Sequence, residues 1–231
     1  MNEHIVKSYE DELNTLTAET ARMGGLTEAQ LADAINGVVR RDQQLAESVV
    51  GRDERLDVLQ ADIERKAIRL IALRQPLAND LRRTVAAMKI ATNLERCGDL
   101  AKNIAKRTLV ITESEPMTPL TRSIERMGHL VQARVKDVLD AYTSSDVDRA
   151  LAVWSRDDEV DEHYNSLFRE LLTYMMADPR TITACAHLLF VAKNLERIGD
   201  HATNIAEIVH YEITGEEMIS ADRPKTDALR A

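Results

Sequence analysis

A fourteen-residue stretch with helical periodicity occurs twice in the chain. NLERCGDLAKNIAK spans Asn93–Lys106 and NLERIGDHATNIAE spans Asn194–Glu207, and ten of the fourteen positions are identical. The apolar residues recur at helical spacing: Leu94, Cys97, Ala101 and Ile104 in the first copy, and Leu195, Ile198, Ala202 and Ile205 in the second. We therefore expect each stretch to form a helix that buries this side in one half of a duplicated chain.

The repeat extends well beyond these two stretches. ARMGGL at Ala21–Leu26 matches ERMGHL at Glu125–Leu130, and Asp53 matches Asp157, both 104 residues apart. The two long stretches lie only 101 residues apart, so the second copy lacks three residues. We place this deletion in the turns at Pro76 and Pro179, since proline disfavours helix in the residue before it.

Periodicity predicts three helices in each copy: 4–40, 43–74 and 78–112 in the first, and 117–142, 146–177 and 180–213 in the second. Asp42 and Asp146 stand where N-caps belong. The expected fold is all-α, with two tandem pseudo-symmetric three-helix bundles. Its parts are a first bundle over 1–112, a second over 113–214 that opens with the linker ESEPMTP, and a polar C-terminal tail over 215–231.

Composition narrows the class of protein. The 231 residues carry a net charge of −9, which argues against a nucleic-acid binder. The N-terminus lacks the apolar core of a signal peptide, and no apolar run approaches membrane-span length. We expect a cytoplasmic protein without direct membrane insertion. Cys97 and Cys185 are expected to be buried, inert thiols, and Trp154 and Phe168 to be packing anchors.

Carboxylates one helical turn apart mark both copies. The pairs are Asp53 with Asp57, Glu95 with Asp99, Asp157 with Asp161, and Glu196 with Asp200. Each pair lies about 20 residues, or roughly 30 Å of helix, from the turn of its hairpin. Both pairs of one copy therefore reach the same level of an antiparallel hairpin, where four carboxylates can gather.

Two interpretations of these carboxylates stay open. Oxygen ligands suit Mg²⁺, Ca²⁺, Mn²⁺ or ferric iron, whereas Zn²⁺ normally takes His or Cys, and only His201 lies beside a motif. Alternatively, salt bridges neutralise the acids, because Lys102 and Lys106 fall on the acidic face of the first copy. The second copy has Thr203 and Glu207 there, so we expect it to be the better metal site if only one binds.

The glycines of the two stretches have two readings as well. Gly98 and Gly199 cost a helix about 1 kcal/mol each relative to Ala. A close contact with a neighbouring helix explains them, and so does open space for an ion. These glycines also argue against a ferritin-like oxidase, which needs a histidine three residues after the glutamate. We therefore expect no enzyme.

The chain, apart from its tail, resembles the PhoU family of regulatory accessory proteins of bacterial phosphate-specific transport. The resemblance rests on Leu94–Arg107, Asn194–Glu207, RQPLANDLR at Arg74–Arg82 and the MG-x-L element of each copy, in that order and spacing. It implies two PhoU bundles. It also places the family's metal motifs on Asp53, Asp57, Glu95, Asp99, Asp157, Asp161, Glu196 and Asp200, with Mg, Mn, Fe or Zn as the candidate ions.

The resemblance also implies a function. Family members repress the phosphate-starvation response and damp phosphate uptake when phosphate is plentiful. The implied partners are the ATPase subunit of the phosphate ABC transporter and the phosphate-responsive sensor histidine kinase, and we also expect a homodimer. The alternative is a carboxylate-rich metal-binding or metal-storage protein without a signalling role. Nothing in the sequence indicates a pocket for free phosphate, so we expect the phosphate signal to be sensed elsewhere.

Overall fold

The structure, a computed structural model, describes residues 2–113 and 118–218, with side chains from Tyr9 onward and without that of Thr118. This part of the chain is helical and contains no strand. The elements in order are α1 (Asn2–Arg40), α2 (Gln43–Arg52), α3 (Glu54–Arg74), α4 (Ala78–Ile111), α5 (Thr118–Ser144), α6 (Val147–Ser155), α7 (Asp158–Ala177), the 3₁₀ helix η1 (Pro179–Thr181) and α8 (Ile182–Thr214).

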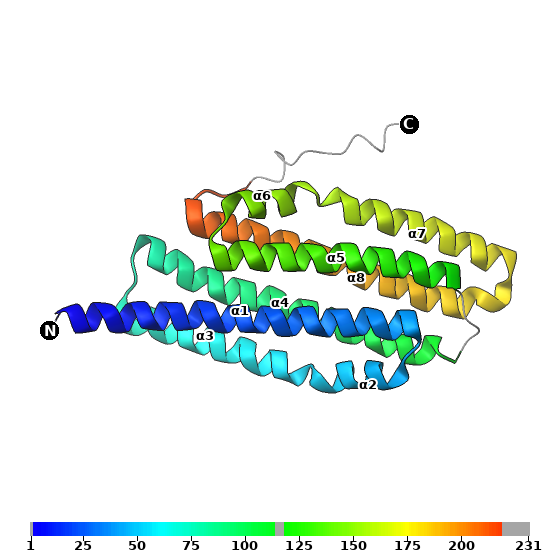
Figure 1. Cartoon of the computed structure of the whole chain (residues 1–231), viewed down its shortest axis with the longest axis horizontal. Helices are drawn as coiled ribbons and strands as arrows, with labels where there is room; N and C mark the ends of the chain where they lie inside the picture. Colours follow the sequence, from blue (N-terminus) through cyan, green and yellow to red (C-terminus); the bar gives the residue numbers. More distant parts are fainter. Residues whose placement is uncertain (1, 114–117, 219–231) are drawn as a thin grey trace.

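Two bundles lie side by side along the long axis of the molecule (Figure 1). In the first, α1 and α4 pack together and against α2 and α3, and in the second, α5 and α8 pack together and against α6 and α7. The bundles meet where α4 lies along α8 and α1 along α5. This arrangement confirms the all-α fold of two tandem bundles. No helix of the described segments is both long and apolar enough to cross a bilayer.

The second helix of each bundle is interrupted, whereas periodicity predicted continuous helices over 43–74 and 146–177. The breaks fall at Asp53 and at Arg156–Asp157. A turn forms at the first break, where the amide of Leu56 donates to the carbonyl of Asp53 over 2.8 Å. At the second break the carbonyls of Val153 and Arg156 accept hydrogen bonds from the Arg134 guanidinium. These side-chain bonds satisfy groups that a continuous helix would have paired internally.

The predicted caps and turns are present. The Asp42 carboxylate accepts from the amide of Leu45 over 2.9 Å, and that of Asp146 accepts from the amide of Arg149 over 3.0 Å. Gln75 takes a left-handed conformation at the first turn, with φ of 49°. The shorter second turn is filled by η1. The expectation that proline would end both hairpin helices is therefore confirmed.

The core contains the two predicted apolar stripes, every residue of which is buried. Both cysteines are free and buried, and burial raises the pKa of Cys97 to about 12. Trp154 is a packing anchor, but Phe168 is not, because it is exposed at the surface of α7. The periodicity of α7 did not reveal which of its apolar residues face the core.

The predicted tail begins in an ordered way. Gly215 ends α8 in a left-handed conformation with φ of 78°, and Met218 packs against the core. The predicted polar tail therefore begins with residues that pack against the rest of the molecule. The rest of the tail, 219–231, and the centre of the predicted linker, 114–117, lie outside the described residues.

Candidate functional site

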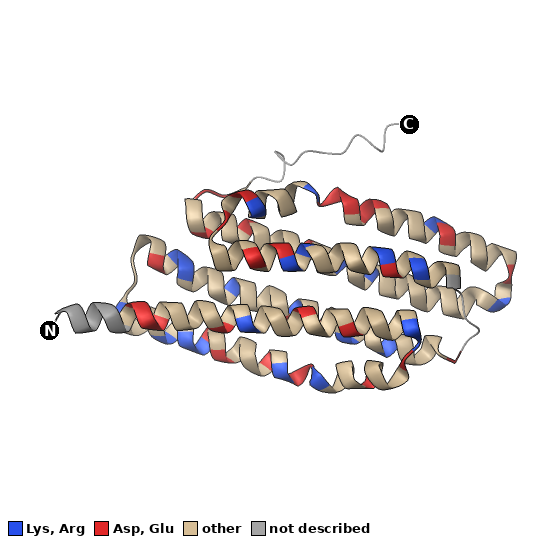
Figure 2. Cartoon of the chain, viewed as in Figure 1, with Lys and Arg blue, Asp and Glu red and all other residues tan. Residues whose placement is uncertain are grey.

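The interrupted helices and the repeated stretches bring the predicted carboxylates to one level in each bundle. Figure 2 shows acidic residues at these levels on α3 and α7. In the first bundle, the pKa of Glu95 is raised by burial and further by Asp99, Asp57 and Asp53. All four carboxylates therefore lie within electrostatic reach of one another, as the distances along the hairpin predicted.

Cations and amides of the protein already occupy the first acidic site. Asp53 is 3% exposed, and one of its carboxylate oxygens accepts from the Gln30 amide over 3.1 Å. The other oxygen accepts from the Lys102 ammonium, which also contacts Asp99 at 3.2 Å. Arg96 lies 3.5 Å from Glu95. The salt-bridge interpretation thus holds for the first bundle.

The second bundle neutralises its equivalent aspartate from a different helix. Arg134 of α5 is fully buried, and its guanidinium lies 3.3 Å from the Asp157 carboxylate. Thr203, which stands where the first bundle has Lys102, donates to the same carboxylate oxygen over 2.6 Å and accepts from Arg134 over 2.9 Å. The positive charge beside the aspartate comes from α4 in the first bundle and from α5, the equivalent of α1, in the second.

Sequence reasoning missed Arg134 and Gln30, although the repeat contains a signal for both. The 104-residue offset aligns Gln30 with Arg134, and the 101-residue offset aligns Lys102 with Thr203. At each of the two aligned positions, one copy has a neutral residue and the other has a cation. Because the two differences are opposite in sign, together they keep one cation beside each aspartate.

The second acidic site keeps more negative charge unneutralised. Partial desolvation raises the pKa of Asp200 to about 6, and nearby Glu196, Asp157 and Asp161 contribute to the rise. Burial and Asp157 likewise raise the pKa of Asp161. Lys193 binds one oxygen of Glu196 at 2.5 Å, while the other is buried without a hydrogen-bond partner among the described residues. This site therefore favours anything that supplies positive charge.

The two glycines serve close helix packing. A Cβ on Gly98 would lie 2.3 Å from Leu56 Cδ1, and one on Gly199 would lie 3.3 Å from Val160 Cγ1. Each glycine thus admits the first buried side chain of α3 or α7 beside the acidic site. The close-contact interpretation is confirmed for both glycines.

The eight predicted metal ligands remain a prediction. In 2–113 and 118–218 no three Asp, Glu, His or Cys side chains are grouped closely enough to hold a metal ion as they stand. In the first bundle Lys102 already bridges Asp53 and Asp99, so that site does not fit a cation. In the second, Glu196 and Asp161 raise the pKa of Asp200, and Lys193 pairs with one oxygen of Glu196 while the other has no partner among the described residues, so this site is the better fit.

Comparison with known families matches this duplicated geometry. The profile described as the PhoU domain matches residues 20–108 and 124–209, which is one match in each bundle. The chain belongs to the PhoU family. A relative from Caulobacter vibrioides, named phosphate-specific transport system accessory protein PhoU homolog, is 71% identical over 99% of both chains. PhoU of Escherichia coli is 36% identical over 100% of this chain and 95% of its own.

Solved PhoU structures have the same fold. The crystal structure of PhoU from Pseudomonas aeruginosa superposes with a TM-score of 0.87 and 38% identity, covering 90% of this chain and 100% of that one. The phosphate transport system regulatory protein PhoU from Streptococcus pneumoniae gives 0.85 and 28%, covering 91% and 99%. These PhoU relatives are named accessory or regulatory proteins, and the chain accordingly belongs to a family of accessory proteins rather than of enzymes.

Proposed function

We propose that the chain is a cytoplasmic negative regulator of the phosphate-starvation response and of phosphate uptake. In this role it is an adaptor between the ATPase subunit of the phosphate ABC transporter and the sensor histidine kinase. The observation that carries the proposal is the pair of PhoU domains, which together span most of a chain 71% identical to a phosphate-specific transport accessory protein.

An adaptor without its own phosphate pocket agrees with the surface of the molecule. A groove of about 590 Å³ lies between α4 and α8, and its basic lining residues are Arg82 and Lys89. Glu207 and Glu217 line the same groove, which gives it mixed charge, and Arg82 is engaged by the carbonyl of Glu212 at 3.2 Å. We therefore place the sensing of free phosphate in a partner of the assembly.

A divalent or ferric cation is part of the proposal, and it belongs to the second bundle. Asp161, Glu196 and Asp200 would hold it, while Asp157 stays bound to Arg134. The ion would supply positive charge that joins α7 to α8 and relieves the repulsion among the carboxylates. Mn²⁺ titration by calorimetry and by thermal shift tests this. Glu196→Gln should abolish the heat, and Glu95→Gln should leave it unchanged.

The function is tested with a phosphate-starvation reporter in cells grown with ample phosphate. Deletion of the gene should raise the reporter strongly, and the intact gene should restore repression. Pull-down of the transporter ATPase and the kinase by the full chain then tests the two partners separately. Unchanged reporter output in the deletion strain would instead favour the metal-storage alternative.

The proposed homodimer is a separate statement with its own test. Sedimentation velocity of the full chain should give a mass of two copies at micromolar concentration. A single-copy mass would remove the dimer and leave the adaptor role in place, because the pseudo-symmetric pair of bundles is already contained in one chain.

A further inference from the structure

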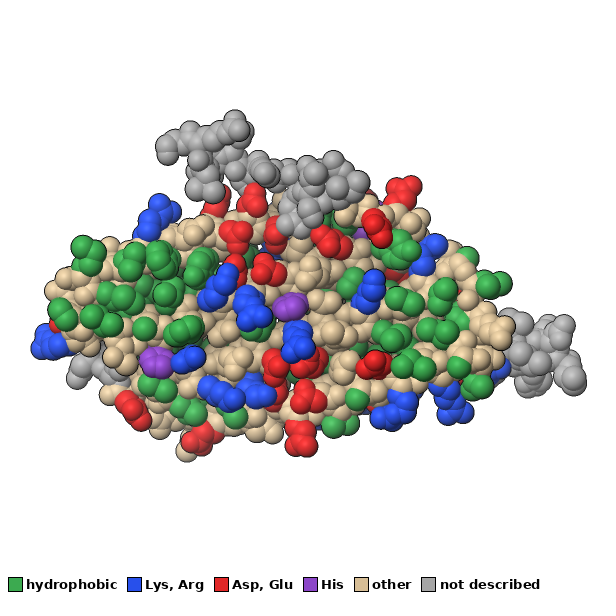
Figure 3. Space-filling model, turned by 180° about the vertical axis from the view of Figure 1, so that it is seen from behind, with side chains coloured by type: hydrophobic (Ala, Val, Ile, Leu, Met, Phe, Trp, Pro, Cys, Tyr) green, Lys and Arg blue, Asp and Glu red, His purple; other side chains and the backbone are tan. Residues whose placement is uncertain are grey.

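The face formed by α7 and α8 near their turn exposes a row of large apolar residues. Phe168, Leu172 and Met176 recur every four residues on α7, and Ile182 and Phe190 are exposed on α8. Met176 is 86% exposed and Phe190 52%. Figure 3 shows apolar side chains gathered at this end of the molecule, at the left of that view. These five residues are called the α7–α8 apolar face below.

The two apolar rows lie at the same level of two helices that pack together. Lys193 of α8 sits over the ring of Tyr164 of α7, 5.3 Å from its centroid, and Tyr164 in turn faces Phe168 at 6.4 Å between ring centroids. In an antiparallel pair, moving toward the turn from this contact brings Phe168 to the level of Phe190 and then Met176 to the level of Ile182. The rows form a surface about 12 Å long, which is two turns of helix.

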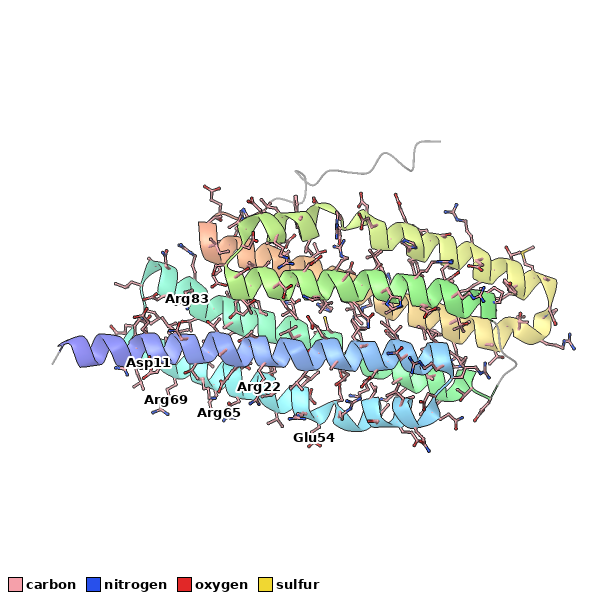
Figure 4. The ribbon with its side chains drawn as sticks, viewed as in Figure 1. Asp11, Arg22, Glu54, Arg65, Arg69 and Arg83 are labelled. Atoms are coloured by element: carbon pink, nitrogen blue, oxygen red, sulfur yellow. The ribbon has the colours of Figure 1, made fainter. Side chains whose placement is uncertain are left out.

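The first bundle repeats this face only in part, although the backbone is equivalent. Leu172 and Ile182 correspond to Ile68 and Leu81, which are also exposed and apolar. The residues equivalent to Phe168, Met176 and Phe190 are Glu64, Ala72 and Lys89, all exposed. On the outer side of α3, Arg65 and Arg69 are also prominent (Figure 4). Packing of the bundle therefore does not require large apolar residues at these positions, and their presence in the second bundle needs another cause.

Cations without a carboxylate partner border the α7–α8 apolar face. Arg107 of α4 lies 4.5 Å above the Phe190 ring and 3.4 Å from His187, and no carboxylate of the described chain pairs with it. Among the residues that the structure describes, Arg169 of α7 bonds only the carbonyl of Asn165. At the turn end of the face, Asp178 is engaged by Arg180. The charge that borders Phe168 and Phe190 is therefore positive, whereas the unneutralised acids of the second acidic site lie on the side of Tyr164 away from the turn.

We propose that the α7–α8 apolar face binds an amphipathic helix of a partner protein whose apolar stripe is bordered by Asp and Glu. The groove between two antiparallel helices receives such a stripe through residues at i, i+3, i+4 and i+7. The bordering acids pair with Arg107 and Arg169. A second copy fits less well, because a two-fold contact would bring the same cations of both copies together. The inference rests on the proposed adaptor role and locates one of its docking surfaces.

Binding of a designed peptide to the full chain tests the proposal. The probe is a fluorescein-labelled helical peptide of about 18 residues, roughly 27 Å long, with a leucine stripe bordered by glutamate. A second peptide has lysine in place of each glutamate. In fluorescence anisotropy the glutamate peptide should bind, and the lysine peptide should bind at least tenfold more weakly. Arg107→Glu should reduce this preference.

The repeat supplies matched variants. Phe168→Glu/Met176→Ala/Phe190→Lys gives the second bundle the residues of the first and should weaken binding at least tenfold. Leu73→Glu/Leu77→Lys, which changes exposed residues at the opposite turn, should change it less than twofold. Circular dichroism checks that both variants fold. Equal binding of the two peptides, no binding, or undiminished binding by the triple variant would overturn the proposal. So would conversion of a wild-type dimer to monomer by the triple variant, because a second copy would then cover the face.

The phosphate reporter separates this inference from the proposed function. If the deletion strain derepresses and the triple variant fully restores repression, the docking face is wrong and the regulatory role stands. If the deletion strain is unchanged while the glutamate peptide binds as expected, the regulatory role is wrong and the helix-binding face stands.

Discussion

The two acidic sites of this protein have nearly the same sequence and different electrostatics. In the first bundle the buried aspartate is held by an amide from α1 and an ammonium from α4. In the second it is held by a guanidinium from α5 and a hydroxyl from α8. Arg134 approaches from the interior of the bundle, whereas Lys102 stands among the carboxylates. The position of one cation therefore decides whether the carboxylates of a repeated acidic motif are neutralised by the protein or remain available to a ligand.

The largest expected effect comes from removing the buried cation of the second bundle. Arg134→Gln leaves the Asp157 carboxylate without its charge partner and deprives two helix-end carbonyls of a donor. We expect a loss of about 3–5 kcal/mol in the free energy of unfolding, measured by urea denaturation. Adding Thr203→Lys copies the arrangement of the first bundle and should recover part of the loss. A loss below about 1 kcal/mol would show that Arg134 does not neutralise Asp157.

Lys102→Thr gives the first bundle the residue of the second at the equivalent position. Asp53 keeps its bond from Gln30 but loses a charge partner, so we expect a loss of about 2 kcal/mol by the same measurement. The carboxylates of the first bundle should then bind Mn²⁺ measurably in calorimetry. Lys102→Thr combined with Gln30→Arg should restore stability and keep the metal binding. Metal binding unaltered by either variant would contradict the account of why the first site is closed.

Substitution of the two glycines should change the free energy of unfolding by smaller amounts that differ between the bundles. A methyl group on Gly98 meets Leu56, and overpacking of this kind costs about 1–3 kcal/mol, against about 1 kcal/mol gained in helix propensity. Gly98→Ala should therefore destabilise the chain by about 1 kcal/mol. Gly199→Ala meets Val160 at a longer distance and should be neutral or slightly stabilising. Equal effects of the two changes would show that the helix spacing is the same in both bundles.

The pH dependence of stability tests the electrostatics of the second bundle. The folded state keeps the proton of Asp200 up to a pKa of about 6, whereas the unfolded chain releases it near 3.8. The folded state thus binds more protons between these values, and stability falls as pH rises through this window. Glu212, whose pKa burial raises to about 7, adds a second decline of the same sign. Asp200→Asn should remove only the first decline. A wild-type curve that rises over this range would contradict both shifts.

The sequence predicted those features of the fold that depend on local pattern. The apolar stripe of each fourteen-residue stretch is buried as expected, and Asp42 and Asp146 cap their helices. Counting residues from the turns placed Asp53 and Glu95 at one level without any knowledge of side-chain contacts. These features follow from helix geometry alone, so one sequence was enough.

The missed features depend on which side of a helix meets the rest of the molecule. Arg134 was not noticed because a lone arginine on an amphipathic helix usually lies at its surface. Its burial requires the break after α6, and Asp157 at that break has ordinary helical angles that leave no mark in the sequence. Phe168 was misplaced for the related reason that α7 has large apolar residues on more than one side. Both errors disappear once α5, α7 and α8 are packed together.

The contact between α4 and α8 has a consequence for the origin of the chain. These helices carry the repeated stretch, and across their contact His201 of one bundle lies 2.9 Å from Asn93 of the other. A half-length chain with one bundle would expose the same side of its last helix, and it would cover that side by pairing with itself. Fusion of two such halves makes the pairing permanent and independent of concentration. After fusion the two halves can mutate independently. Two identical single-bundle chains could not have carried Lys102 in one bundle and Arg134 in the other.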